Sequence, residues 1–436
     1  MKISTIPFKK KIGIILTAVI LASSLIGCNM PNNSKSSSNN NSTNNNTTTE
    51  ENKNTATTLP EAKVGDFAAA TTSVEMAKNM TIGWNLGNTL DATQGYVQNA
   101  GINTETGWGM PNTTEEMITD IKNAGFKTIR IPVSWHNHIS DTTDYTIDDA
   151  WMNRVKQIVD WAYNKNMCVI INIHHDNLSE AELNGNIGFA ISKDSDKQAQ
   201  SKKYIEKIWT QIANKFSNYD NRLVFEVLNE PRAVDTNLEW WCNDQKLINI
   251  ITSYEQVAVN TIRSVTGNEN RFIMVPGYAA SGSDGTMLSL YKMPTDTAQD
   301  RLLLSAHAYS PYNFAMNDLT DTVFGDDDKG SLDSIFSYLK SNYTDKGIGV
   351  VMGEASATDK ENLSDRVAWA TYYFTKAKEA GIPVVLWDNM VTASTPNSTD
   401  IGERHGYYNR RSNSWYFPTM IQAMMKAVYG ENYTAQ

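Results

Sequence analysis

Short apolar runs alternate with amphipathic stretches along the chain from about residue 65 to its end. Most of these runs are continuous in Val, Ile and Leu, which is typical of parallel strands covered on both faces. Eight runs of this kind predict strands, at Thr81–Gly87, Thr128–Ser134, Val169–His174, Leu223–Leu228, Phe272–Pro276, Leu302–Ala308, Val350–Gly353 and Val384–Trp387.

The stretches between these runs carry apolar residues at helical spacing. One helix is predicted to begin at Thr113-Thr114-Glu115-Glu116, which has capping-box chemistry, and to end at Gly125. Another is predicted to begin at Asp148. Further helices are predicted at residues 204–216, 251–265, 332–339, 366–380 and 418–428.

Eight strands interleaved with helices predict an α/β fold, a (β/α)8 TIM barrel that forms a single catalytic domain over residues 65–436. An open, doubly wound sheet is the competing arrangement. No glycine-rich phosphate loop follows the first strand, so a dinucleotide site lacks support. The chain of 436 residues is 40% hydrophobic, which is enough for a large core.

The N-terminal segment has the features of an export signal. Four lysines precede the apolar run Ile12–Ile26, which is too short for a stable transmembrane helix. The segment Leu25-Ile26-Gly27-Cys28 resembles the lipobox of bacterial lipoproteins, although an ordinary secretory signal with an incidental cysteine is the alternative. We therefore predict a signal peptide at 1–27, lipidation at Cys28, and a lipid-anchored protein on the extracellular face of the bacterial cell membrane.

Residues 28–64 differ in composition from the rest of the chain. They are rich in Ser, Thr and Asn and hold few residues that can be buried in a core, so we expect a disordered linker. The whole chain has 38 basic and 48 acidic residues, and this acidic balance argues against a nucleic-acid partner. Apart from Cys28, only Cys168 and Cys242 are present, and we expect both to be free thiols.

Polar side chains stand at the ends of six of the eight predicted strands. In a TIM barrel the functional side chains lie at the carboxyl ends of the strands, above the mouth of the barrel. The residues in these positions are Arg130, His174, His175, Asp176, Asn229, Glu230, His307, Tyr309, Glu354, Trp387 and Asp388.

Two of these residues, Glu230 and Glu354, follow the fourth and seventh strands, on roughly opposite sides of the barrel. A pair of carboxyl groups across a cleft suits the cleavage of a glycosidic bond, and a separation of about 5–5.5 Å would indicate retention of configuration. Asn229 can hold a sugar hydroxyl beside the reacting carbon, and Arg130 can keep a nearby carboxylate ionised.

The motifs at the strand ends resemble, in their order, those of glycoside hydrolase family 5, over roughly residues 75–430. They read Ile-Arg-Ile-Pro, His-His-Asp, Leu-Asn-Glu-Pro, His-Ala-Tyr, Gly-Glu and Leu-Trp-Asp-Asn. The segments at 83–91 and 108–111 are similar to those of bacterial endoglucanases with broad β-glucan and xyloglucan activity. One departure is Met390, where the family pattern has Asn.

This resemblance implies a retaining endo-β-1,4-glucanase, a cellulase, in which Glu230 is the acid/base and Glu354 the nucleophile. It implies a substrate-binding set made of Arg130, His174, Asn229, His307, Tyr309 and Trp387. We expect a β-glucan substrate, no cofactor, no metal and a monomer. The alternatives are an endo-xyloglucanase, lichenase or mannanase with the same residues, and a non-catalytic surface lipoprotein that only binds glycans.

Two acidic or histidine-rich segments suggest metal sites but have simpler interpretations. His174 and His175 could bind a metal with Asp176, but neighbours on a strand point to opposite faces, so we expect only one histidine to enter the site. The segment 326–330, Asp-Asp-Asp-Lys-Gly, lacks the ligand order of a calcium loop, and we interpret it as a solvated acidic loop.

The tryptophans divide by their surroundings. Trp240 and Trp241 lie in a predicted loop, where a sugar subsite and simple packing are equally favoured, whereas four others lie on helix patterns and are predicted core residues: Trp151, Trp161, Trp209 and Trp369. Trp387 is preferred over Asp388 as the side chain that faces the site.

Two further expectations concern the chemistry of the site. No Gly-x-Ser-x-Gly turn supports serine acyl chemistry. Because two like charges in one site raise the pKa of one carboxyl, we expect Glu230 to carry the proton in the resting site.

Overall fold

The computed structural model describes residues 64–316, 319–396 and 398–433. Residues 1–55 lie outside this described part, and the barrel is formed within residues 56–436. Eight parallel strands close on themselves in the order β1-β10-β9-β8-β7-β6-β5-β2. Their bounds are β1 Ile82–Asn85, β2 Thr128–Ile131, β5 Cys168–Asn172, β6 Leu223–Glu226, β7 Ile273–Ser281, β8 Leu302–His307, β9 Gly349–Ala355 and β10 Val384–Leu386.

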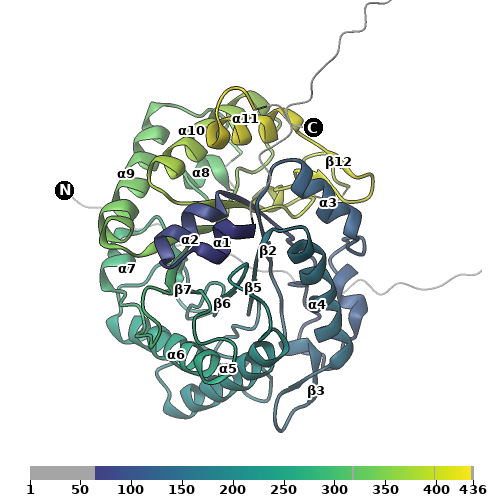
Figure 1. Cartoon of the computed structure of the whole chain (residues 1–436), viewed down its shortest axis with the longest axis vertical. Helices are drawn as coiled ribbons and strands as arrows, with labels where there is room; N and C mark the ends of the chain where they lie inside the picture. Colours follow the sequence, from purple (N-terminus) through teal and green to yellow (C-terminus); the bar gives the residue numbers. More distant parts are fainter. Residues whose placement is uncertain (1–63, 317–318, 397, 434–436) are drawn as a thin grey trace, which may run out of the picture. The chain divides into compact units, whose positions relative to one another are not determined.

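Helices surround this ring of strands, as Figure 1 shows from one end of the barrel. Each strand is followed along the chain by at least one helix, so the predicted (β/α)8 fold is confirmed. The helices that follow the strands are α3 Glu115–Asn123, α4 Asp149–Asn164, α5 Ser195–Lys215, α6 Gln245–Ser264, α7 Gly285–Leu290, α8 Tyr312–Ala315, α9 Asp326–Asn342, α10 Leu363–Glu379 and α11 Pro418–Tyr429.

Short elements decorate the connections between strands and helices. Two antiparallel hairpins are formed by β3 Ile139–Asp141 with β4 Thr146–Ile147, and by β11 Tyr408–Asn409 with β12 Ser414–Trp415. Single turns of 3₁₀ helix lie at Ile102–Thr106, His136–His138, Thr344–Lys346 and Ile401–Glu403.

Helix ends follow the local chemistry of the sequence. Thr114 is the N-cap of α3, where its hydroxyl accepts a hydrogen bond from the backbone N–H of Met117, and Gly125 follows the helix with φ +108°. Asp148 caps α4 in the same way. The expected acidic loop at 326–330 is wrong, because these residues form the first turns of α9. Acidic side chains stabilise the positive end of a helix, and the Asp328 carboxylate accepts a bond from the N–H of Gly325.

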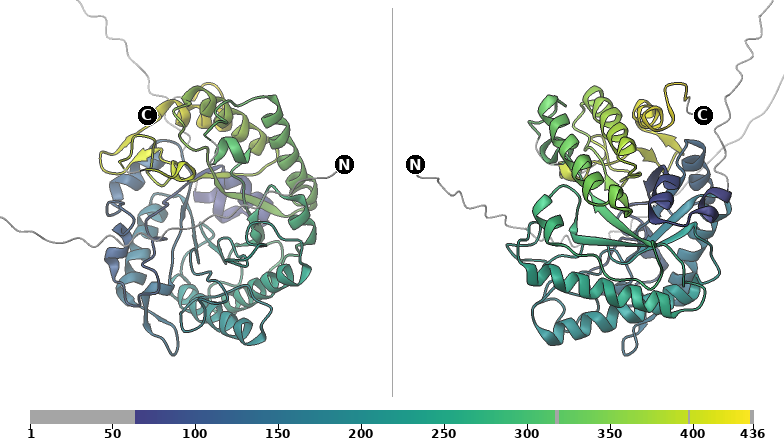
Figure 2. Two further views of the ribbon diagram at one scale, coloured as in Figure 1. Left: turned by 180° about the vertical axis from the view of Figure 1, so that it is seen from behind. Right: turned by 60° about the vertical axis from the view of Figure 1, so that its left-hand side comes forward.

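The amino-terminal end of the barrel is covered by α1 Val64–Ala69 and α2 Ser73–Met80. In Figure 1 the two helices lie across the near end of the strands, and in the left view of Figure 2 they lie behind them. Phe67, Met76 and Met80 pack against inward-facing residues of the barrel, namely Cys168, Ile170, Val224, Met274, Leu303, Val351 and Val385. These two helices therefore close the floor of the barrel, and functional side chains are left to the opposite end.

Close approach of α2 to the barrel depends on Gly349 at the start of β9. A Cβ atom at this position would lie 2.2 Å from the carbonyl oxygen of Ser73, which no packing can accommodate. The glycine N–H also donates a 2.9 Å hydrogen bond to the Ser73 hydroxyl. The barrel floor is thus fixed by both packing and a buried polar contact.

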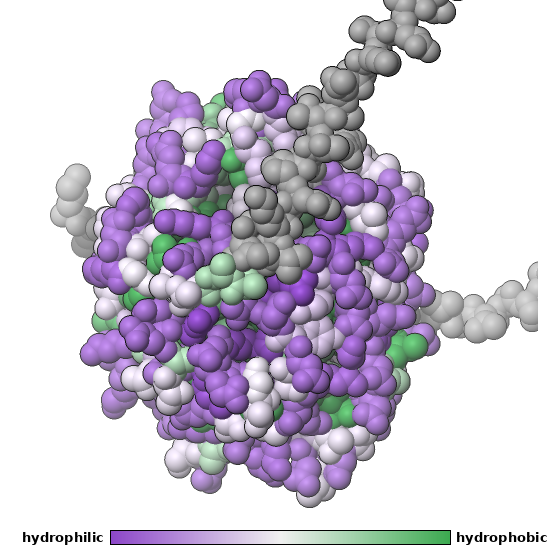
Figure 3. Space-filling view, in the orientation of Figure 1, coloured by the Kyte–Doolittle hydropathy of each residue, from purple (hydrophilic) through white to green (hydrophobic). Residues whose placement is uncertain are grey.

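Burial agrees with the predicted core. Trp151, Trp209 and Trp369 are fully buried and Trp161 packs partly buried against the same core, as expected. Cys168 and Cys242 are buried free thiols, also as expected. From the end that carries α1 and α2, the surface is largely hydrophilic (Figure 3). Among the described residues, no helix has both the length and the apolar character needed to span a bilayer.

Candidate active site

One cavity of about 720 Å³ lies at the carboxyl ends of the barrel strands. It brings together side chains from loops that are far apart in the sequence. Of the eight predicted catalytic and substrate-binding residues, seven line this cavity: His174, Asn229, Glu230, His307, Tyr309, Glu354 and Trp387. The eighth, Arg130, is fully buried at the end of β2 and contacts the lining residues from below.

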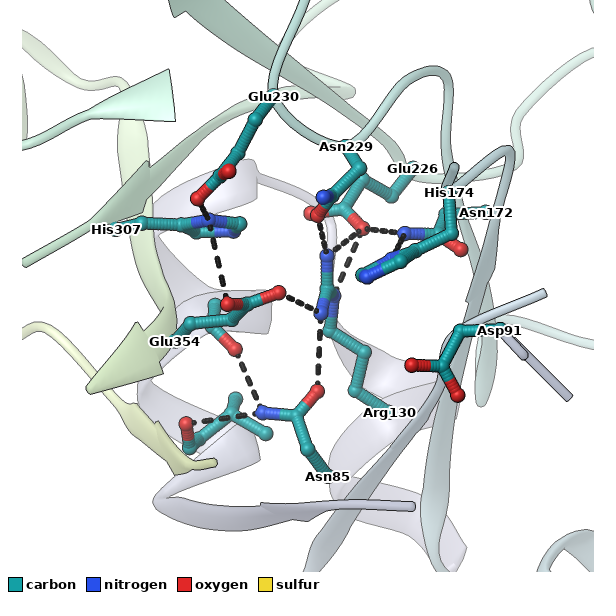
Figure 4. Close-up of polar contacts among 12 residues, drawn as sticks. Asn85, Asp91, Arg130, Asn172, His174, Glu226, Asn229, Glu230, His307 and Glu354 are labelled. Carbon is teal, nitrogen blue, oxygen red and sulfur yellow. Dashed lines mark hydrogen bonds and ion pairs between the residues drawn. The ribbon is translucent and has the colours of Figure 1, made fainter. Parts of the chain in front are cut away.

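Arg130 is the centre of a buried polar network (Figure 4). Its guanidinium donates to the carboxylate of Glu226 at 2.8 Å, to Glu354 at 2.7 Å and to the amide oxygens of Asn85 and Asn229 at 3.0 and 2.7 Å. The two nearby carboxylates raise the pKa of Arg130 further, against the opposing effect of burial. The arginine is therefore a fixed positive charge that positions several groups at once.

Glu354 is held from two sides. Besides the bond from Arg130, its second oxygen accepts a 2.7 Å hydrogen bond from the hydroxyl of Tyr309, whose own pKa is raised by burial and by the nearby carboxylate. This arrangement suits an ionised carboxylate, because both partners donate. Glu354 thus presents an oriented carboxylate oxygen to the cavity.

Glu230 pairs with a different residue, His307. The ring Nδ1 of His307 lies 2.8 Å from Glu230 and 3.8 Å from Glu354, and Figure 4 shows both contacts. Burial alone would raise the pKa of Glu230, but the hydrogen bond to His307 and the charges of His307, Arg232 and Arg130 outweigh it and lower the pKa. For His307, burial is outweighed by the charges of Glu354 and Glu230, which raise its pKa.

The expected position of the proton in the resting site is therefore wrong. In the substrate-free site the proton of the Glu230–His307 pair is favoured on the histidine rather than on the carboxylate. Sequence reasoning counted the repulsion between the two glutamates but omitted the imidazole placed between them. Gly353 permits this placement, since a Cβ there would lie only 3.1 Å from His307 Nε2.

The two glutamates are close to each other. One oxygen of Glu230, one of Glu354 and a ring nitrogen of His307 all lie within 4.8 Å of one another. This agrees with the short separation of retaining glycosidases, about 5–5.5 Å, rather than the 6.5–9.5 Å or so that leaves room for a water in inverting enzymes.

Sequence and structure comparisons identify the family. The family described as Cellulase (glycosyl hydrolase family 5) matches residues 90–392. The chain belongs to glycosyl hydrolase family 5. It is 37% identical to Endoglucanase B of Neocallimastix patriciarum, over 86% of this chain and 76% of that protein. It is 39% identical to Cellulase/esterase CelE of Acetivibrio thermocellus over 81% of this chain, but it spans only 40% of that longer protein.

Solved structures give the same result. A GH5-4 broad specificity endoglucanase from Ruminococcus champanellensis with bound cellotriose superposes with a TM-score of 0.75 at 37% identity, covering 81% of this chain and 98% of that one. A glycoside hydrolase 5 lichenase from Caldicellulosiruptor sp. F32 in complex with cellotetraose gives a TM-score of 0.74 at 37% identity, with 82% and 96% covered. The chain is thus a glycoside hydrolase of a family whose similar members are endoglucanases.

Three residues of this family 5 site were missed by the sequence reasoning: Asn85, Asn172 and Glu226. Glu226 accepts bonds from Arg130, Asn172 and Ser305 and is fully buried. Each of the three is a lone polar residue at the end of an otherwise apolar strand. Such a position is itself a signal, because a buried polar group requires partners inside the barrel.

Asn172 also sets the state of His174. Its amide nitrogen lies 3.0 Å from His174 Nδ1, while its oxygen accepts the N–H of Val133. Nδ1 must then accept, which places the ring proton on Nε2. Burial lowers the pKa of His174 well below its usual value, so the ring is neutral. His174 therefore offers an N–H to a ligand in the cavity.

Aromatic rings form the walls of the cavity. Trp387 and His174 have parallel rings with centroids 5.9 Å apart. Trp108 lies against His175 at 5.5 Å, and Trp240 lines the rim with the guanidinium of Arg232 over its ring at 4.0 Å. Flat rings that line a cavity in this way are suited to the apolar faces of sugars.

The expectation that only one of the two adjacent histidines enters the site is wrong. Both His174 and His175 line the cavity. The strand-alternation argument fails because β5 ends at Asn172, so the two histidines lie beyond the regular strand.

Asp388 faces away from the cavity, as expected. It is fully buried and accepts bonds from the indole of Trp84 and from the backbone N–H groups of Met390, Tyr407 and Tyr408. These contacts hold the segment that carries Trp387. Met390, the departure from the family pattern, is mostly buried with φ +63° and does not line the cavity among the residues described.

Two clusters of carboxylates and histidines have the spacing for a metal ion, but their surroundings do not favour one. Asp91, His174 and His175 come close enough for a shared ion, as do Glu230, His307 and Glu354. In the first cluster both oxygens of Asp91 already accept backbone N–H groups, from Asn88 and Thr89. In the second, the charge of Arg130 opposes a cation. The donor sets therefore favour hydrogen bonding to an uncharged ligand.

Proposed function

We propose that this family 5 enzyme hydrolyses internal β-1,4 bonds of cellulose-type glucans by double displacement, with Glu354 as nucleophile and Glu230 as acid/base. The observation that carries the assignment is the unequal setting of the two carboxylates. Glu354 receives two hydrogen bonds from Arg130 and Tyr309, whereas Glu230 is joined to His307, a group that can exchange a proton with it.

In the first step Glu354 forms a bond to the anomeric carbon while the bond from that carbon to the leaving oxygen breaks. The leaving oxygen takes the proton held by the Glu230–His307 pair, through Glu230. When substrate displaces water from the cavity, the charged form of Glu230 is less well solvated, which moves the proton from His307 toward Glu230. The product of this step is a glycosyl ester on Glu354.

In the second step a water molecule attacks the same carbon. Glu230 accepts a proton from this water as its oxygen bonds to carbon, and the ester bond to Glu354 breaks. Two inversions at one carbon leave the β configuration unchanged. The charge on Glu354 disappears in the intermediate and returns in this step, and Arg130 is in place to stabilise it.

Neighbouring residues are placed to bind the sugar. Because Asn229 accepts from Arg130 through its oxygen, its amide N–H groups remain free to donate to a hydroxyl beside the anomeric carbon. The neutral His174 donates through Nε2, and Trp387 offers its ring face. No step of this mechanism requires a cofactor.

The preferred glycan within the β-glucans is a separate question. Cellulose-type glucan is our first candidate, and mixed-linkage glucan is the second because two similar structures are named lichenases. Xyloglucan and mannan are further alternatives with the same catalytic residues. A reducing-sugar assay with carboxymethylcellulose, lichenan, xyloglucan, xylan and mannan distinguishes them. A non-catalytic glycan-binding protein predicts no activity on any of these.

Substitution of the two glutamates tests the roles. Glu354→Gln should abolish turnover on every substrate because no ester can form. Glu230→Gln should lose about 10²–10⁴-fold on polysaccharide, the usual contribution of a general acid, yet still release nitrophenol from an activated aryl glycoside in a first burst. Glu206→Gln, at an exposed carboxylate on α5, is the matched control and should be fully active. Normal polysaccharide hydrolysis by Glu230→Gln would refute the assignment.

The location of the enzyme is a further part of the proposal. The predicted signal peptide, Cys28 and the linker up to residue 63 lie outside the described residues. We propose export and lipid anchoring through Cys28, supported by the lipobox-like sequence. Cys28→Ser should move activity from the membrane fraction to the medium or leave uncleaved precursor. The proposed monomer is tested by size-exclusion chromatography with light scattering.

A further inference from the structure

A buried arginine joins two neighbouring strands at the mouth of the barrel. Arg410 directly follows β11 and is only 2% exposed. Its guanidinium donates to the carbonyl oxygen of Gly87 and the hydroxyl of Thr89, both at 2.8 Å. It also donates to the carbonyl oxygen of Asp388. Gly87 and Thr89 follow β1, Asp388 follows β10, and these two strands pair with each other. Arg410 therefore ties together the two chain segments that leave their carboxyl ends.

The same two segments support the ring of Trp387. A Cβ atom at Gly87 would lie 2.9 Å from ring atom Cζ2 of Trp387 and 2.8 Å from the carbonyl oxygen of Asp388. The N–H of Gly87 donates to that carbonyl oxygen at 3.2 Å. Because both approaches are too close for a side chain, the ring packs against the bare backbone of Gly87. Its position in the cavity wall depends on how the two segments are held together.

The planar guanidinium has the shape that this connection requires. Its Nη1 serves both acceptors on the β1 side, and its Nη2 serves the carbonyl group on the β10 side. Nη2 also lies 3.9 Å from a carboxylate oxygen of Asp388, which balances the buried charge. A lysine carries the same charge as a single ammonium group, so it does not reproduce a fork that spans two segments. The identity of Arg410 thus matters for geometry as well as for charge.

We propose that Arg410 is a positioning residue of the glycosidase reaction, which fixes the ring of Trp387 in the wall of the active-site cavity. Arg410 is not among the described residues that line this cavity, so it acts through the carbonyl groups of Gly87 and Asp388 rather than on the substrate. The inference rests on the proposed function, because the position of the ring affects turnover only if a sugar packs against it.

Arg410→Lys tests this role because it keeps the positive charge and removes the fork. Arg271→Lys is the matched control. Arg271 is also buried, at 3% exposure, and donates to backbone carbonyl groups, but it precedes β7 at the amino-terminal end of the barrel. It therefore reports the effect of losing buried hydrogen bonds away from the mouth. Thr89→Val is a second, milder variant that removes one acceptor of Arg410, and it carries the same comparison if Arg410→Lys does not fold.

The position of the ring can be followed without any measurement of activity. The protein is labelled with fluorotryptophan, and the fluorine NMR signal of Trp387 is assigned by its loss in Trp387→Phe. We expect Arg410→Lys to shift or broaden this signal, Thr89→Val to shift it by a smaller amount, and Arg271→Lys to leave it in place. An unmoved Trp387 signal in the folded mouth variants, or an equal change in Arg271→Lys, would overturn the proposal.

Kinetics on cellohexaose test whether Arg410 acts through this ring. The loss of a well-placed aromatic contact corresponds to about a tenfold decrease in kcat/KM, and we expect a decrease of this size for Arg410→Lys. In the Trp387→Ala background the same substitution should change kcat/KM by less than about twofold, because the group that it positions is absent. Arg271→Lys should stay within about twofold in either background.

Two kinetic results would contradict the proposal. One is a wild-type kcat/KM in the folded mouth variants. The other is an equal decrease for Arg410→Lys with and without Trp387, which would show that the arginine acts through another group. Failure of the proposed function looks different. The unmodified enzyme would then not cleave cellohexaose, while the fluorine signal of Trp387 would still respond to Arg410→Lys.

Discussion

Glu226→Gln is the most direct test of the buried network under the active site. Glu226 lies at the end of β6 with no exposed surface, and its carboxylate accepts hydrogen bonds from Arg130, Asn172 and Ser305. Glutamine has nearly the same shape but carries an NH₂ group in place of one oxygen. Placed toward Ser305, that group can donate to the serine hydroxyl while the remaining oxygen keeps Arg130 and Asn172, so the main loss is the charge that pairs with Arg130.

The magnitude follows from the burial of the charges. Arg130 would keep only Glu354 as a neighbouring carboxylate, and breaking a buried ion pair by removing one partner costs about 3–5 kcal/mol. An isosteric amide retains some of the hydrogen bonds, so we expect a loss of about 3 kcal/mol in the free energy of unfolding. Since Arg130 also positions Glu354 and Asn229, we expect a loss of about 10²-fold in kcat as the geometry loosens.

Urea unfolding followed by tryptophan fluorescence measures the first quantity, and hydrolysis of 4-nitrophenyl cellobioside well below the melting temperature measures the second. Glu239→Gln is the control, because Glu239 pairs with Arg232 in a partly exposed setting and should cost no more than about 1 kcal/mol. If Glu226→Gln costs no more than this control, Arg130 does not depend on Glu226 and our account of the network is wrong.

Three other predictions concern the proton, a buried acid and the barrel floor. His307→Asn cannot hold a proton beside Glu230, so the basic limb of the pH profile of kcat/KM should move to lower pH; an unmoved limb would show that Glu230 titrates alone. Burial raises the pKa of Glu255, whose partner is the hydroxyl of Tyr291 at 2.7 Å. The unfolded chain therefore loses this proton first, and above pH 4.5 or so the wild type should lose about 1.4 kcal/mol of stability per pH unit relative to Glu255→Gln, until the folded group ionises. Parallel urea curves for the two proteins between about pH 5 and 7 would contradict this. Phe67→Ala should lower stability by about 3 kcal/mol by opening the floor of the barrel, while kcat stays unchanged; a melting temperature equal to that of the wild type would show that α1 is dispensable.

The eight strands could be predicted because each depends mainly on its own residues. Continuous apolar runs such as Val169–Ile171 are buried on both faces of the wall, and the sequence carries that property locally. The position of the functional residues could also be predicted, since the barrel fixes which strand ends meet. Glu230 and Glu354 are separated by 124 positions in the sequence. Because both follow strands of one barrel, both were expected at the same end of it.

Features that depend on distances between elements were harder to predict. The start of α9 was misassigned because Asp326–Asp328 is typical of a loop in composition, and only the helix that follows makes these charges favourable. Glu226 was overlooked because it is one polar residue at the end of an apolar strand, and a single polar residue does not change the prediction of a strand. Its role becomes visible only with Arg130, 96 positions earlier, beside it.

The position of the proton shows why chemistry is harder to predict than fold. Two neighbouring glutamates repel each other, so the site should hold one extra proton, and this much could be inferred from the sequence. Which group gains it depends on what lies between them, and here an imidazole lies 2.8 Å from one carboxylate and 3.8 Å from the other. A histidine elsewhere at this mouth, such as His174, has its pKa lowered well below its usual value by burial and stays neutral. The same residue type is thus a proton carrier or a neutral ligand according to which carboxylates face it.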